Sequence, residues 1–156
     1  MTPLALASTP GESKKLRKKA GSAQRTFAVS RAGASAFAAA LLSGDPPCDR
    51  AALVIEGVSR TLYHVGPLIA RPPLEALPRD TTIAANSREA SAALLAAALS
   101  DCVDFWFVPT PGGLIVYADN DEYATVFAHR QGAVSKAGER LRAAGLPEVA
   151  GYERRW

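Results

Sequence analysis

The chain has 156 residues, of which 48% are hydrophobic and 21% charged, a composition typical of one soluble globular domain. No apolar run reaches the roughly 20 residues that a membrane-spanning helix needs, and the first ten residues lack the basic start of a secretory signal. These features exclude a membrane-spanning helix and predict a cytoplasmic protein whose Cys48 and Cys102 are free thiols. The abundant alanine is typical of a GC-rich genome and favours a bacterial or phage origin.

Positive charge is concentrated near the N-terminus. Residues 1–25 hold six basic side chains against one acidic side chain, a net charge of +5, whereas the remaining residues carry a net charge of −2. Residues 1–24 mix proline, glycine and serine with few apolar residues, so they bury too little surface to offset the entropy lost on ordering. We therefore predict a flexible basic arm over residues 1–24 and one folded domain over residues 25–156. The basic residues are Lys14, Lys15, Arg17, Lys18, Lys19 and Arg25.

The first half of the folded domain is predicted to contain a strand, a helix and a hairpin. TFAVS (26–30) is a predicted strand, and an alanine-rich helix follows over about 31–43. After a loop rich in proline and glycine, AALVIEGV and TLYHVG are two predicted strands joined by a tight turn at Ser59 and Arg60. The proline-punctuated residues 66–80 are predicted to form an irregular crossover.

The second half begins in the same way and then extends the sheet. TTIAA (81–85) is a predicted strand, and a helix follows it to about Ser100. CVDFWFVP, GLIVYA and YATVFA are three further predicted strands, with residues 110–113 as the turn between the first two. A last helix over about 132–144 ends where glycine and proline follow.

The two halves share an order of elements. Residues 26–45 align without gaps on residues 82–101, although most of the identities are alanine. The pattern predicts an α+β fold, with a mostly antiparallel sheet and alanine-rich helices on one face. A tandem repeat of two β-α-β-β units, over residues 25–80 and 81–156, would account for the shared order.

The acidic stretch VYADNDEYATVF (116–127) has two interpretations. Asp119 and Asp121 could hold Mg²⁺ with His64 or His129 as the base, which would make the protein a metal-dependent hydrolase or nuclease. Asp and Asn also adopt left-handed backbone conformations and bond their own main chain, as a short hairpin loop requires. Because no second acidic motif has a matching spacing, the sequence favours the hairpin, and we predict no catalytic residue, metal or cofactor.

Basic and aromatic residues are the candidate contacts with partners. The arm can neutralise phosphates and release counterions; its alternatives are docking on an acidic protein or merely solubilising the chain. Trp106, in the run FWF, is either buried in a central strand or an exposed platform for a base or a partner protein. Arg154, Arg155 and Trp156 resemble an interface anchor. Four residues near the last helix would extend the basic surface: Arg130, Lys136, Arg140 and Arg142.

These features predict a small non-enzymatic binding protein. Its arm would contact nucleic acid, and its folded body would contact a partner protein or a second copy of the chain. The first alternative is a protein-interaction factor, such as an inhibitor, an immunity protein or an accessory subunit, with no nucleic-acid role. The second alternative is the metal-dependent hydrolase or nuclease that uses Asp119 and Asp121. No membrane contact is predicted.

Overall fold

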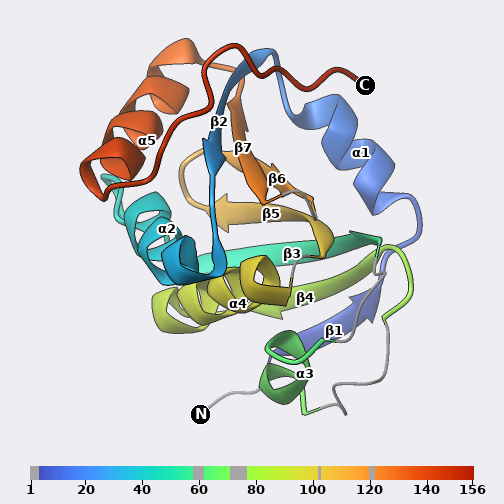
Figure 1. Cartoon of the computed structure of the whole chain (residues 1–156). Helices are drawn as coiled ribbons and strands as arrows, with labels where there is room; N and C mark the ends of the chain where they lie inside the picture. Colours follow the sequence, from blue (N-terminus) through green and yellow to red (C-terminus); the bar gives the residue numbers. More distant parts are fainter. Residues whose placement is uncertain (1–3, 58–61, 71–76, 102, 120–121) are drawn as a thin grey trace.

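The computed structural model describes residues 4–57, 62–70, 77–101, 103–119 and 122–156. Seven strands within them form one sheet in the order β1-β4-β3-β5-β6-β7-β2, and every neighbouring pair is antiparallel (Figure 1). The strands are β1 (Ala5–Ser8), β2 (Ala23–Ala28), β3 (Arg50–Gly57), β4 (Thr81–Ala85), β5 (Asp104–Thr110), β6 (Ile115–Ala118) and β7 (Tyr123–Ala128). The predicted α+β class is confirmed.

Helices cover both faces of this sheet. The helical elements are α1 (Glu12–Lys19), the short 3₁₀ turn η1 (Arg31–Gly33), α2 (Ala34–Leu42), α3 (Val65–Leu68), α4 (Arg88–Asp101) and α5 (Gln131–Ala143). The alanine-rich helices α2 and α4, together with α5, form a layer on one face, and α1 lies on the other (Figure 1). None of the helices in the described ranges is both long and apolar enough to cross a membrane.

The alternation of strand residues produces two hydrophobic cores. Residues such as Leu53 and Phe107 point toward the layer of α2, α4 and α5 and belong to the larger core. Their neighbours along the same strands, such as Val54 and Trp106, point to the opposite face, because successive side chains of a strand alternate. The central strands are therefore apolar on both faces, and the run FWF is buried throughout.

Residues 4–24, the described part of the predicted flexible arm, instead belong to the sheet and its covering layer. β1 pairs with β4, and α1 follows it immediately. The carboxylate of Asp80 accepts hydrogen bonds from the backbone N–H groups of Gly11 and Ser13, at 2.9 and 3.1 Å. Leu16 of α1 is buried in the smaller core. The amino-acid composition did not predict β1 and α1, because both are short and are stabilised by contacts with residues far away in sequence.

The predicted strand TLYHVG, the second strand of the hairpin expected in the first half, is also wrong. Residues 62–64 lead into the one-turn helix α3, and the predicted turn at Ser59 and Arg60 lies outside the described residues. β3 instead pairs with β4 on one side and β5 on the other. Among the described residues, the first half thus has no second hairpin strand, and the tandem repeat is not confirmed.

The hairpins of the second half agree with the prediction. β5 pairs with β6, and β6 pairs with β7, so the acidic stretch connects two neighbouring antiparallel strands. The backbone N–H of Asp119 donates to the Tyr123 carbonyl at 3.4 Å, and Glu122 adopts a left-handed conformation with φ of 69°. Asp121 lies outside the described residues.

Candidate functional site

The outer face of α1 carries a cluster of exposed lysines. Leu16 and Ser13 are buried against the sheet, whereas Lys14, Lys15, Lys18 and Lys19 are exposed. A spacing of one and four residues places all four on the side of the helix that faces solvent. None of them forms an ion pair with another described residue. We call this group the lysine face of α1.

The two arginines of the predicted basic arm have structural roles. Arg17 forms an ion pair with Glu56 of β3, and its guanidinium lies 4.7 Å from the ring centroid of Trp156. Arg25 of β2 forms a two-pronged ion pair with Glu148, which raises the pKa of Arg25 and lowers that of Glu148. Because their charges are compensated, these arginines hold the fold together and contribute less to the exposed positive surface than the lysines do.

Arg154 binds the body of the protein, which corrects its prediction as a partner contact. Its side chain is only 6% exposed and donates to the Asp119 carboxylate at 2.6 Å and to the Thr125 hydroxyl at 2.7 Å. Its main-chain N–H and carbonyl both bond the side-chain amide of Gln24, at 2.8 and 3.0 Å. The C-terminal segment (residues 152–156) is thereby fastened across the face of the sheet that also carries α1 (Figure 1).

The two tryptophans lie in one aromatic cluster but differ in exposure. Trp106 is fully buried, so it is not the exposed platform that was one of its two predicted roles. Trp156 is 54% exposed, and its ring centroid lies 5.5 Å from that of Trp106 and 5.1 Å from that of Tyr117. Arg155 is exposed and bonds Glu153 at 3.2 Å. Of the predicted C-terminal anchor, Trp156 and Arg155 are accessible to a partner.

The candidate metal site is not assembled by the described residues. Asp119 is held by Arg154, Asp121 lies outside the described ranges, and His129 is exposed at the end of β7. Within those ranges, no group of three or more histidine, cysteine or acidic side chains is placed to hold a metal ion. The described part of the chain therefore does not gather a cluster of three such ligands around Asp119.

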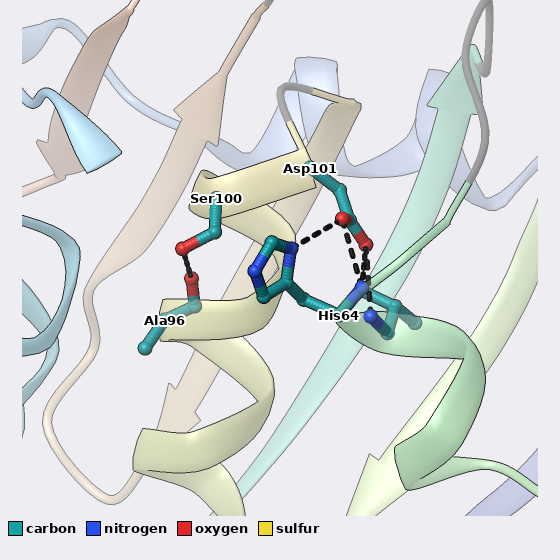
Figure 2. Close-up of polar contacts among 5 residues, drawn as sticks. His64, Ala96, Ser100 and Asp101 are labelled. Atoms are coloured by element: carbon teal, nitrogen blue, oxygen red, sulfur yellow. Dashed lines mark hydrogen bonds and ion pairs between the residues drawn. The ribbon is translucent and has the colours of Figure 1, made fainter. Parts of the chain in front are cut away.

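His64 and Asp101 form a pair that local sequence did not reveal. The Asp101 carboxylate, 1% exposed, accepts hydrogen bonds from the backbone N–H groups of His64 and Val65 and lies 2.8 Å from the imidazole Nδ1 (Figure 2). Because a carboxylate accepts, the imidazole Nδ1 carries a proton and donates it to Asp101. The hydroxyl of the neighbouring Ser100 donates to the Ala96 carbonyl within α4, as helical serines commonly do.

This pair has a structural explanation. An aspartate-oriented imidazole is a common general base in enzymes. Here the same carboxylate also satisfies N–H groups at the start of α3, so helix capping accounts for its position. One sequence signal could have revealed it: Asp101 is the last residue of α4, where the helix dipole disfavours negative charge and a compensating partner is needed.

A cleft of about 740 Å³ lies on the side of the sheet that carries α2, α4 and α5, between the end of α2, the turn after β5 and the start of α5. Its charged lining is mixed, with three basic and two acidic side chains: Arg130, Lys136, Arg140, Asp45 and Glu139. The guanidinium of Arg140 donates to the last carbonyls of α2, those of Ala40 and Leu41. Burial raises the pKa of the Cys48 thiol, which also lines the cleft. The four residues predicted to extend the basic surface do not extend the lysine face, because they lie in or next to α5 and α1 lies on the opposite face of the sheet: Arg130, Lys136, Arg140 and Arg142.

A scan against protein-family models, a search of curated proteins and a search of solved structures each found no match to this chain. Its function therefore has to be inferred from the described residues.

Proposed function

We propose that this protein binds nucleic acid through the lysine face of α1 and has no catalytic role. One observation carries the proposal: Lys14, Lys15, Lys18 and Lys19 are exposed together on a helix that is docked on the body, and no described acidic side chain pairs with them. Residues 26–156, by contrast, have a net charge of −2. Positive charge is therefore concentrated where it can meet a polyanion.

The docking of α1 favours such binding on energetic grounds. Lysines that neutralise phosphates release condensed counterions, which gives affinity that is independent of sequence and sensitive to salt. A flexible arm would lose backbone entropy when it became ordered on its ligand, at about 1–2 kcal/mol per residue fixed. In α1 that ordering has already taken place on folding, so a larger share of the electrostatic gain remains as binding free energy.

Deleting residues 1–24 would not test the proposal cleanly, because it would remove β1 and α1 and expose the smaller core. The better variant replaces Lys14, Lys15, Lys18 and Lys19 with glutamine. Its affinity for a short DNA duplex is measured by fluorescence anisotropy between about 50 and 200 mM salt. Each phosphate contact contributes about −0.9 to the slope of log affinity against log salt, so the variant should lose up to about 3.6 of that slope.

A matched control separates the lysine face from net charge. Four exposed arginines elsewhere in the chain are replaced with glutamine, removing the same charge: Arg31, Arg50, Arg88 and Arg142. Three of them belong to η1, α4 and α5, away from α1. This control should keep most of the salt slope. The proposal fails if the wild type does not bind nucleic acid, or if the two variants lose affinity equally.

A protein partner or a second copy of the chain is less well supported. Tyr63 and Leu68, at α3, are exposed apolar side chains beside the half-exposed His64. These two side chains, or three with the exposed Trp156, are few compared with the roughly 20–30 residues per side of a standard interface. Nucleic acid is therefore the better-supported ligand class.

A further inference from the structure

We infer that the nucleic acid held by the lysine face is single-stranded, and that Trp156 stacks on one of its bases. The inference rests on the proposed function and adds the class of ligand. Its starting point is that Trp156, 54% exposed, lies on the same face of the sheet as α1. Arg17 joins the two features, because it comes from α1 and its guanidinium lies over the Trp156 ring at 4.7 Å.

The Trp156 ring packs against the aromatic cluster. Trp106 lies at 5.5 Å and 48° to it, Tyr117 at 5.1 Å and 80°, and Phe127 at 6.5 Å, all measured between ring centroids. Arg154, two residues earlier, is bonded to three groups of the sheet and fixes the chain that carries the ring. A ring that is ordered before binding loses little further entropy when a base stacks on it.

The lysine face and the Trp156 ring together have the features by which proteins bind single-stranded nucleic acid. Proteins that bind single strands combine a basic surface along the backbone with aromatic or guanidinium planes on which bases stack. The lysine face supplies the first, and the exposed part of Trp156 supplies the second. A duplex keeps its bases paired and stacked inside, so it offers phosphates to the lysines but no base to Trp156.

A purely structural role for Trp156 leads to a different expectation. If the ring only covers the aromatic cluster, an apolar side chain without a π face should replace it with no effect on binding. Trp156→Leu tests this directly, and Trp156→Phe retains a stacking face. Arg155→Ala serves as the control for charge on the same segment, because this exposed side chain forms its ion pair with Glu153 of that segment.

The experiment compares an oligodeoxythymidylate of about 16 nucleotides with a duplex of the same length, by fluorescence anisotropy at fixed salt. Trp156→Leu should weaken binding of the single strand about 5- to 100-fold and leave duplex binding unchanged, whereas Trp156→Phe should retain most of the affinity. Urea unfolding of each variant establishes that it is folded. In addition, the single strand should quench the tryptophan fluorescence of the wild type, and Trp156→Phe, which keeps only the buried Trp106, should lose that quenching.

The outcomes separate the two proposals. If the wild type binds both nucleic acids, and Trp156→Leu weakens both equally or neither, stacking is overturned while the lysine face stands. If Trp156→Leu unfolds the protein, the quenching measurement decides, and equal quenching in the wild type and Trp156→Phe overturns the inference. If the wild type binds neither nucleic acid, the proposed function fails and the inference fails with it.

Discussion

Replacing Leu16 with alanine should lower the free energy of unfolding by about 2–3 kcal/mol. The side chain is 5% exposed and lies in the same core as Trp106 and Tyr117. Leucine-to-alanine changes in protein cores cost about 2–5 kcal/mol, and more where the surroundings cannot close the cavity. The lower end applies here, because α1 is a short helix on the outside of the sheet and can move inward.

Urea unfolding measures this change, with tryptophan fluorescence as the reporter, because Trp106 lies in the same core as Leu16. The matched control is Lys15→Ala, which changes the adjacent, exposed residue of the same helix. Its stability should stay within about 0.5 kcal/mol of the wild type. A Leu16→Ala protein as stable as this control would refute the reasoning, since α1 would then not be docked in solution. The lysines would in that case lie on a flexible arm, without a preformed face.

Two further predictions concern the carboxylates that cap short elements. Asp101→Ala should lower the free energy of unfolding by about 2–3 kcal/mol in urea, because it leaves buried N–H groups unpaired. His64→Ala should lower it by less than about 1 kcal/mol, because its imidazole is half-exposed. Equal losses in the two variants would contradict the capping role of Asp101. Burial alone would raise the pKa of Asp80, but hydrogen bonds from Ser13 and from the N–H of Gly11 outweigh it and lower the pKa. The stability that this carboxylate contributes is therefore present above its unfolded pKa and lost as pH falls below about 4. The difference in free energy of unfolding between wild type and Asp80→Asn should then shrink on acidification. A difference that stays constant with pH would contradict this role of Asp80.

The elements that could be predicted are those that neighbouring residues in the sequence specify. The strands β5, β6 and β7 follow one another through short turns, so the alternation of apolar residues and the turn residues reveal both their existence and their pairing. The alanine-rich helices α2 and α4 were evident for the same reason. By contrast, β1 pairs with β4, far along the chain, and no local pattern indicates a partner at that distance.

The candidate site was harder to predict, because the chemistry of a side chain depends on what the fold places beside it. Asp119 was a candidate metal ligand and Arg154 a candidate partner contact, yet the two bind each other. Arg25 was counted among the binding residues, and it pairs with Glu148, far away in sequence. The amino-acid composition does not distinguish these charges from one another. Only the ion pairs of the folded structure show which charges are compensated.

These ion pairs leave few charged or aromatic side chains available to bind a ligand. Once Arg17, Arg25 and Arg154 are paired with carboxylates and Trp106 is buried, the lysine face and Trp156 remain accessible on one side of the sheet. Exposed charge without a partner does not stabilise a fold, since neighbouring lysines on a helix repel one another by a few tenths of a kcal/mol. An anionic ligand would relieve this repulsion, and it would do so most where the charges are held together, as they are on α1. The same docking that overturned the prediction of a flexible arm thus strengthens the prediction that this segment binds nucleic acid.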